Sequence, residues 1–183
     1  MPHWKNQNPT EAQLETMRNI KAVVLDVDGV LTDGGIIYGS KETEIKRFDC
    51  KDGLGLRLWL KSGHQIAIIT GRISEAVALR AKDIGITYLY QKCGDKKAVI
   101  KRFSEESGIP LKNICAIGDD LIDLPMLLQA GLPAAVGDAT VETLAAVQLV
   151  SLKPGGRGAV REILEYILKG QGLWDQLIAE YYA

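Results

Sequence analysis

Short apolar runs recur along the chain, each ending at a polar residue or a glycine, and this alternation restricts the possible folds most. The runs at 22–25, 66–69 and 114–117 consist almost wholly of Ala, Val, Ile, Leu and Cys. Runs of this kind are typical of strands buried on both faces. The amphipathic stretches between them predict an α/β fold, a Rossmann-like parallel sheet with helices on both faces.

The same periodicity assigns elements to most of the chain. Strands are predicted at 22–25, 66–69, 87–90, 114–117, 133–136 and 148–151, and a small β-hairpin at 35–48. Helices are predicted at 11–18, 53–61, 74–84, 96–107, 121–130, 140–146, 158–169 and 173–182. There is no internal repeat or linker, so we expect a single domain over residues 1–183 with a C-terminal tail at about 172–183.

Composition excludes several classes of protein. The formal net charge of −1 is unlike the basic excess of a nucleic-acid binder. The three cysteines show no CxxC spacing, which indicates reduced thiols in a cytoplasmic protein rather than a zinc site or disulfides. Residues 1–20 lack the apolar segment of a signal peptide, and no run reaches the about 18 apolar residues of a membrane span. We therefore expect a soluble, cytoplasmic protein with neither nucleic acid nor membrane as partner.

Acidic residues gather after two of the predicted strands. Asp26 and Asp28 follow the first strand, and Gly29 permits a sharp turn after them. Asp119, Asp120 and Asp123 follow the strand at 114–117. Because the carboxyl ends of parallel strands meet at one edge of a sheet, both groups should converge there. Converging carboxylates favour a hard cation, and we expect Mg²⁺.

Two further strand ends offer groups that suit a phosphate. Thr70, Gly71 and Arg72 follow the strand at 66–69 and provide a hydroxyl, a backbone amide and a guanidinium. Lys96 begins a predicted helix and can hold a phosphate as a point charge. Together with Mg²⁺, these groups stabilise a phosphoryl group in transfer. The pattern therefore predicts an enzyme that acts on a phosphate monoester.

The order of these groups resembles the haloacid dehalogenase superfamily of aspartate-nucleophile phosphatases. That superfamily places DxDG after a first strand, followed by a Thr or Ser, a Lys and an acidic group. By this resemblance, Asp26 is the nucleophile that forms an aspartyl-phosphate, and Asp28 is the general acid and base. The fold it implies is the haloacid dehalogenase-like core. The segments after Asp26 and Thr70 are too short for a cap domain.

The resemblance also implies roles for the remaining polar residues of the site. Mg²⁺ is held by the side chains of Asp26 and Asp119 and by the backbone carbonyl of Asp28. Thr70 and Lys96 hold the phosphoryl group. Asp120 and Asp123 orient Lys96 and the waters of the metal.

A closer resemblance covers residues 20 to 170. It rests on the segments Asp26–Gly34, Phe48–Gly53, Ile69–Arg72, Leu89–Gln91, Gly118–Pro125 and Gly155–Glu162. They look like those of the 3-deoxy-D-manno-octulosonate 8-phosphate phosphatases, which are capless tetramers of the bacterial lipopolysaccharide pathway. This implies a sugar acid phosphate as substrate and a homotetramer in which neighbouring subunits close the active site. The hairpin and the tail are the expected contacts. In the tail, Trp174, Tyr181 and Tyr182 either pack within the subunit or enter a neighbouring active site.

The substrate-binding residues follow from the same resemblance. They are Asp49, Lys51, Asp52, Gly53, Arg57, Gly71, Arg72 and Arg80. An arginine suits the carboxylate of a sugar acid, which it can bind through two hydrogen bonds. Asp49 and Lys51 stand where enterobacterial members have Asn and Arg. Arg157, between glycines, either touches the substrate or braces its loop.

Two kinds of alternative remain open. One is a phosphatase for another sugar acid, a nonulosonate 9-phosphate, because the core motifs would be nearly the same. The other is a non-enzyme: a phosphoacceptor signalling domain, or a scaffold. In a phosphoacceptor domain the aspartate lies on a middle strand and has no neighbouring acid or base. The position of Asp28 two residues after Asp26 therefore favours the enzyme.

Overall fold

The computed structural model describes residues 3–4, 10–40 and 43–182 and contains a seven-stranded sheet of order β1-β9-β8-β7-β2-β5-β6. Its strands are β1 (His3–Trp4), β2 (Ala22–Leu25), β5 (Gln65–Ile69), β6 (Tyr88–Tyr90), β7 (Ile114–Gly118), β8 (Leu132–Ala135) and β9 (Leu149–Val150). β1 is antiparallel to β9, and the other six strands are parallel. The predicted parallel sheet is confirmed.

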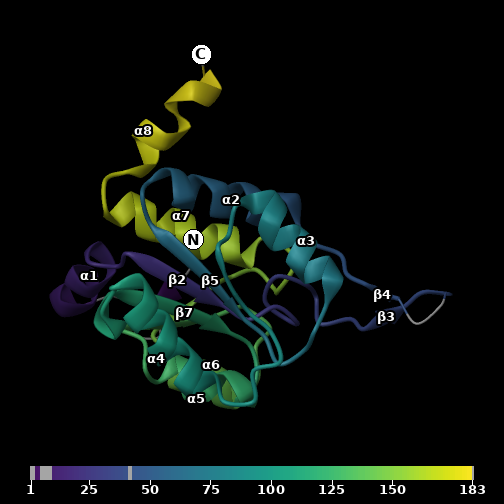
Figure 1. Ribbon diagram of the computed structural model, residues 1–183. Helices are drawn as coiled ribbons and strands as arrows, with labels where there is room; N and C mark the ends of the chain where they lie inside the picture. Colours follow the sequence, from purple (N-terminus) through teal and green to yellow (C-terminus); the bar gives the residue numbers. More distant parts are fainter. Residues whose placement is uncertain (1–2, 5–9, 41–42, 183) are drawn as a thin grey trace.

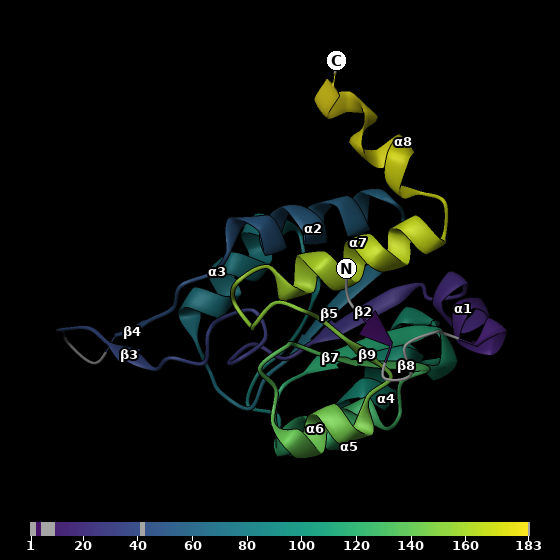
Figure 2. The ribbon, with the colours of Figure 1, turned by 180° about the vertical axis from the view of Figure 1, so that it is seen from behind.

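Helices cover both faces of this sheet, as predicted. They are α1 (Glu11–Arg18), α2 (Cys50–Lys61), α3 (Glu75–Ile84), α4 (Lys96–Ser107), α5 (Leu124–Leu127), α6 (Val141–Ala146), α7 (Ala159–Gly170) and α8 (Trp174–Ile178). The two views of Figures 1 and 2 show α2, α3 and α7 on one face and α4, α5 and α6 on the other. The core therefore consists of two apolar layers, one on each side of the strands.

The register of the three central strands determines where the polar residues lie. Leu25 of β2 pairs with Ile68 of β5 and with Ile117 of β7. The side chains of β2 are fully buried, as expected of a central strand in a sheet covered on both faces. The residues just after these paired positions must therefore meet at one edge of the sheet.

Two segments project from this body (Figures 1 and 2). The first is the predicted hairpin, formed by β3 (Ile37–Tyr38) and β4 (Glu44–Ile45), which pair antiparallel. The second is the C-terminal segment, α8 followed by the 3₁₀ turn η4 (Ala179–Tyr182). The continuous helix predicted for 173–182 is therefore wrong in its second half.

Two other predicted boundaries are wrong and one strand was not predicted, each for an identifiable reason. The helix expected at 121–130 is the 3₁₀ turn η3 (Leu121–Asp123) followed by the single-turn α5. There the Asp123 carboxylate accepts hydrogen bonds from the N–H groups of Asp119 and Asp120, which tightens the chain. Helix α2 begins at Cys50, before the predicted 53, because Asp49 caps it. The two-residue β1 has no periodicity that could reveal it.

None of the helices in the described part of the chain combines the length and apolar character needed to cross a bilayer.

Candidate active site

Asp26 lies directly after β2, at the carboxyl edge of the sheet. Its backbone N–H donates to the carbonyl of Ile117 on β7, 3.1 Å away, and only 3% of its surface is exposed. The chain then turns sharply: the carbonyl of Val27 accepts from the N–H groups of Val30, Leu31 and Thr32. We call residues 26–34 the nucleophile loop, after the role that the sequence predicts for Asp26. This loop presents Asp26 from the rigid centre of the sheet.

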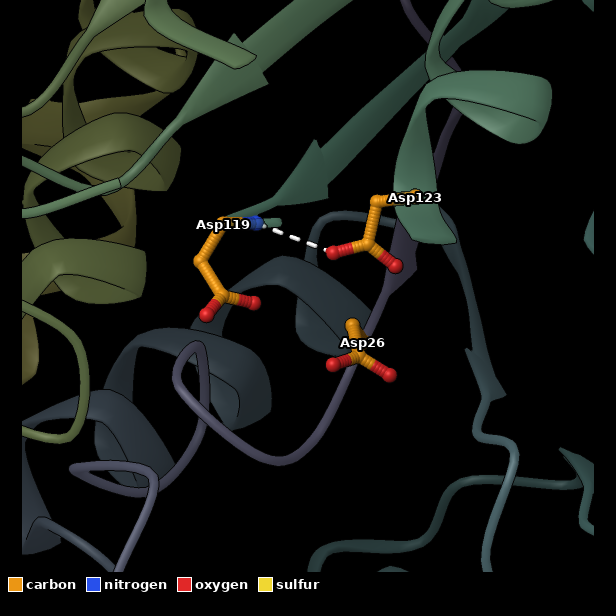
Figure 3. A group of neighbouring side chains, drawn as sticks. All are labelled: Asp26, Asp119 and Asp123. Atoms are coloured by element: carbon orange, nitrogen blue, oxygen red, sulfur yellow. Dashed lines mark hydrogen bonds between the residues drawn. The ribbon is translucent and has the colours of Figure 1, made fainter. Parts of the chain in front are cut away.

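Three carboxylates converge at this edge, as Figure 3 shows. Asp26, Asp119 and Asp123 each place one oxygen within 4.8 Å of the others. Asp123 Oδ2 accepts a hydrogen bond from the backbone N–H of Asp119 at 2.9 Å, which fixes the two residues relative to each other. The predicted meeting of the two acidic groups is therefore seen in the structure.

Lys96 lies between two of these carboxylates. It begins α4, and its Nζ is 2.6 Å from Asp26 Oδ1 and 2.6 Å from Asp123 Oδ1. Burial lowers the pKa of this amine, but Asp26 and Asp123 outweigh burial and raise the pKa above its usual value. Lys96 is therefore a buried lysine whose charged ammonium form is favoured.

One lysine does not balance three carboxylates. Burial, together with the charge of Asp123, raises the pKa of Asp26 to about 6 despite the opposing effect of Lys96. Burial and the charges of Asp123 and Asp26 raise the pKa of Asp119 to about 8. Both shifts mean that the site disfavours its own negative charge, which is the condition under which carboxylates bind a cation.

The donor set fits a hard divalent cation such as Mg²⁺. Asp119 Oδ1 is buried and has no hydrogen-bond partner among the described residues. Gly29, at φ +98°, leaves room for this side chain, since a Cβ atom there would lie 2.0 Å from Asp119 Oδ2. Asp119 is thus held close to the nucleophile loop with an oxygen to spare for a ligand.

Thr70 reaches the same edge from β5. Its side chain is buried, and its Oγ1 accepts from the backbone N–H of Arg72 at 3.3 Å. Its backbone bonds to Tyr90 and Cys93 hold this turn against the end of β6. Gly71 is exposed beside it. The structure therefore brings Thr70, Lys96 and Asp26 to one edge, as the sequence predicts.

Asp28 has partners that sequence reasoning missed. Lys46, just after β4, places its Nζ 2.5 Å from Asp28 Oδ1 and 3.3 Å from Glu44 Oε1. Arg72 donates to Glu44 Oε1 at 2.7 Å and lies 3.9 Å from Asp28 Oδ2. The alternation of acidic, apolar and basic residues at 44–46 was the available signal, but it looks like that of any solvated hairpin.

The start of α2 gathers most of the predicted substrate-binding residues. Arg80 Nη2 donates to the carbonyl of Asp49 at 3.3 Å, and a Cβ atom on Gly53 would lie 2.1 Å from that nitrogen. Lys51 is exposed in the first turn. Asp52 is 2% exposed and accepts from the N–H groups that begin α7, as described below. Burial raises the pKa of Asp52 to about 6.

Two predicted site residues have their side-chain contacts elsewhere. Arg57 donates to the side chain and carbonyl of Asp83 on α3, and half of its side chain is exposed. Asp120 is exposed and accepts from the N–H of Leu121, so it caps η3. A role for either residue in catalysis or substrate binding stays a prediction.

The glycine-rich segment 155–158 packs against the nucleophile loop. A Cβ atom on Gly155 would lie 1.7 Å from the carbonyl oxygen of Gly29, and Gly156 N–H donates to the carbonyl of Val30. The segment ends at α7, where Asp52 accepts from the N–H groups of Gly158 and Arg161 at 3.2 and 2.7 Å. This segment therefore supports the nucleophile loop from behind.

The chain is similar in sequence to known hydrolases. A family model described as haloacid dehalogenase-like hydrolase matches residues 83–163. The 3-deoxy-D-manno-octulosonate 8-phosphate phosphatase KdsC of Escherichia coli strain K12 is 42% identical over 158 residues, covering 86% of this chain and 84% of that protein. The protein of the same name from Yersinia pestis is 40% identical over the same share of each.

Solved structures show the same similarity. The phosphatase of this name from Moraxella catarrhalis, in complex with magnesium ion, phosphate ion and KDO, is 42% identical with a TM-score of 0.89 over 92% of this chain and 97% of that chain. A Xanthomonas campestris hypothetical protein has a TM-score of 0.91 at 33% identity over 100% of both chains. This chain belongs to the 3-deoxy-D-manno-octulosonate 8-phosphate phosphatase family of haloacid dehalogenase-like hydrolases.

Proposed function

We propose that this chain is a magnesium-dependent phosphatase that hydrolyses 3-deoxy-D-manno-octulosonate 8-phosphate to the free sugar acid and phosphate. The observation that carries the proposal is the buried cluster of Asp26, Asp119 and Asp123, with Lys96 Nζ 2.6 Å from Asp26. The substrate is the one for which the relatives are named. The reaction belongs to lipopolysaccharide biosynthesis.

Asp26 is the nucleophile. Its carboxylate attacks phosphorus, the bond between phosphorus and the sugar oxygen breaks, and an aspartyl-phosphate forms. Burial of Asp26 removes the water that would otherwise solvate and weaken the nucleophile. Lys96, bonded to Asp26 Oδ1, holds the carboxylate in one orientation and contributes positive charge where the phosphoryl group arrives.

Asp28 moves the protons. It donates a proton to the departing sugar oxygen, and then takes one from the water that attacks the aspartyl-phosphate. Its side chain is 18% exposed, unlike that of Asp26, so both the sugar and a water can reach it. A single residue can therefore serve both halves of the reaction.

Asp26, Asp119 and the backbone carbonyl of Asp28 would hold Mg²⁺. When bound, Mg²⁺ supplies positive charge that offsets the charge of the phosphate and of the carboxylates around it. Asp123 orients Lys96 through its Oδ1 and the backbone of Asp119 through its Oδ2. We assign the Thr70 hydroxyl and the Gly71 amide to the remaining phosphoryl oxygens.

The sugar acid is assigned to the side of the site formed by the start of α2 and by α3. Arg72 and Arg80 are the cations there, and an arginine matches a carboxylate through two hydrogen bonds. The backbone of Asp49 and Gly53 lies against Arg80. Lys51 completes this group by its position in the first turn of α2.

The assembly is proposed from the exposed apolar side chains of the two projecting segments. The hairpin exposes Ile37, Tyr38 and Ile45, and the C-terminal segment exposes Tyr181 and Tyr182. Exposed apolar side chains on projecting segments indicate contacts with another subunit. We propose a cytoplasmic homotetramer in which these segments close neighbouring sites.

The test is phosphate release in the presence of Mg²⁺ from a panel of substrates. The panel contains octulosonate 8-phosphate, nonulosonate 9-phosphates and common hexose phosphates. A clear preference in kcat/KM for octulosonate 8-phosphate is expected. Preference for a nonulosonate would retain the mechanism and change the substrate, with Asp49 and Lys51 as the first residues to exchange. Absence of release from every substrate would contradict the proposal and favour a phosphoacceptor or scaffold domain.

A further inference from the structure

The side chain of Lys46 is buried, although most of the hairpin is exposed. This side chain is 1% exposed while the residue as a whole is half-buried, and the neighbouring residues Ile45 and Tyr38 are 51% and 70% exposed. A lysine is almost never buried unless its charge is paired, because its desolvation is costly. The position of Lys46 therefore has to be explained by what it contacts.

Lys46 contacts two carboxylates, one of which is that of Asp28. Lys46 Nζ is 2.5 Å from Asp28 Oδ1 and 3.3 Å from Glu44 Oε1. Glu44 in turn binds Arg72, whose Nε and Nη2 donate to Glu44 Oε1 at 3.2 and 2.7 Å. Arg72 pairs with Glu44, and its Nε lies 3.9 Å from Asp28 Oδ2, beyond hydrogen-bond distance. Among the described residues, Lys46 is thus the cation in direct hydrogen-bond contact with Asp28.

The Asp28 carboxylate depends on this contact for its orientation. In the part of the chain that the structure describes, its side chain accepts one hydrogen bond, and Lys46 donates it. Asp28 lies on the nucleophile loop, whose backbone is fixed by the turn at Val27 and by the segment 155–158. The loop therefore fixes the position of the Asp28 backbone, and Lys46 fixes the orientation of its carboxylate.

We infer that Lys46 is a positioning residue for Asp28, and that the hairpin is therefore part of the machinery for proton transfer. This inference rests on the proposed function, because it assigns Asp28 the proton transfers described above. A general acid must lie within hydrogen-bond reach of the leaving oxygen. Since a displacement of 1 Å costs about 100-fold in rate, loss of Lys46 should slow the steps that need Asp28.

The test exploits the leaving group. The sugar oxygen needs a proton as it departs, whereas p-nitrophenolate leaves without one. For Lys46→Met, kcat on octulosonate 8-phosphate should fall about 10- to 100-fold, with little change in KM. On p-nitrophenyl phosphate, the first turnover should stay near the wild-type rate and the later ones should slow. A burst of p-nitrophenolate should therefore appear or grow, because the aspartyl-phosphate waits for Asp28 to activate water.

Lys101→Met is the matched control. Lys101 is an exposed lysine on α4, so the variant makes the same substitution and loses the same charge away from the hairpin and from Asp28. It should keep wild-type kcat on both substrates. Lys46→Arg keeps the charge and should recover part of the lost rate. If only the aliphatic part of the Lys46 side chain mattered, Lys46→Met and Lys46→Arg would have the same rate.

Each other outcome counts against the inference. Equal losses on both substrates without a burst, or no loss at all, would overturn it. If Lys46→Met shows no cooperative thermal unfolding, Lys46→Gln takes its place in the same assay. Failure of both variants to fold would assign Lys46 a structural role alone. If the wild type releases no phosphate from any substrate, the proposed function itself fails. If the wild type is active and the Lys46 variants are unaffected, only the inference about Lys46 fails.

Discussion

Gly29 and Asp119 are in such close contact that a side chain at position 29 has no room. A Cβ atom there would lie 2.0 Å from Asp119 Oδ2 and 2.5 Å from its Cγ. Gly29 belongs to the loop after β2, and Asp119 follows β7. The two segments that carry the carboxylates can approach this closely only because position 29 has no side chain. The position of Asp119 therefore depends on Gly29, although Gly29 carries no functional group.

Gly29→Ala should therefore weaken Mg²⁺ binding. The new methyl group displaces Asp119, and we expect at least a tenfold loss of Mg²⁺ affinity, about 1.4 kcal/mol, measured by calorimetric titration. Gly63→Ala is the matched control, because Gly63 also has a positive φ, +85°, but a Cβ atom there meets nothing within 4 Å. Both variants should lose about 1–2 kcal/mol of stability from the backbone conformation. Unchanged Mg²⁺ affinity in Gly29→Ala would contradict this account.

Asp26→Asn should abolish turnover and leave the fold intact. An amide cannot form the aspartyl-phosphate, but it fills the same volume. Because burial raises the pKa of Asp26 to about 6, its charge is disfavoured in the folded protein, so the thermal midpoint without Mg²⁺ should not fall. Phosphate release and thermal unfolding measure the two effects. Glu142→Gln, which neutralises an exposed carboxylate on α6, should keep wild-type activity; a near-normal rate in Asp26→Asn would refute the nucleophile assignment.

Removal of the metal should affect stability as well as activity. Burial, together with the charges of neighbouring carboxylates, raises the pKa values of Asp26 and Asp119, and bound Mg²⁺ would offset this unfavourable negative charge. Because Mg²⁺ binds the folded state, it should stabilise that state by about 2.7 kcal/mol at a concentration of 100 times its Kd. The thermal midpoint should rise with Mg²⁺ concentration and return to its lower value with EDTA. Phosphatase activity that persists in EDTA would exclude the metal assignment.

We expect His64 to cause a loss of stability in acid. It is 5% exposed, stacks on Trp59 with 4.5 Å between ring centroids, and has its pKa lowered to about 4 by burial and by Lys21. The unfolded chain has a His pKa of about 6.5. The unfolded state therefore binds more protons between these values, and stability present above pH 6.5 is lost as the pH falls toward 4.

His64→Phe isolates this contribution. The variant keeps an aromatic ring beside Trp59 and removes the titration. Denaturant unfolding at a series of pH values between 7 and 4 should show a smaller decrease in the free energy of unfolding for the variant than for the wild type. Equal decreases would show that His64 is not the group responsible.

Deletion of residues 172–183 should impair catalysis without removing the metal site. If the C-terminal segment closes a neighbouring active site, its loss should raise KM or lower kcat, while Mg²⁺ binding persists. Tyr182→Ala changes a side chain that is 84% exposed and leaves the buried Trp174 in place. It therefore tests the contact with a neighbouring subunit without the loss of packing that the deletion causes. Steady-state kinetics that match the wild type for the deletion variant would reject this role.

Periodicity and strand ends predicted the part of the site that is built on the sheet. Asp26, Thr70 and Asp119 each follow a buried parallel strand by one or two residues, so topology alone brings them together. Lys96 was found in the same way, because it begins a helix after β6. These residues are predictable since their positions depend on backbone geometry that local sequence encodes.

The residues that were missed depend on side-chain contacts between distant segments. Nothing near Lys46 in the sequence indicates that its side chain is buried against Asp28. Similarly, the segment Asp49–Gly53 suggested one binding surface, whereas the carboxylate of Asp52 accepts from the N–H groups that begin α7. Arg57 pairs with Asp83 for the same kind of reason. Such pairings follow from packing, which a single sequence does not specify.

The pairing of β2 with β7 has a consequence for the order in which the site appears during synthesis. The ribosome releases Asp26 early, but Lys96, Asp119 and the segment 155–158 that completes its surroundings come much later in the chain. Until those segments emerge, Asp26 lacks Lys96, Asp119 and its supporting loop. A nascent chain therefore cannot act on phosphate esters before the segment 155–158 has been synthesised and has packed against residues 29–33.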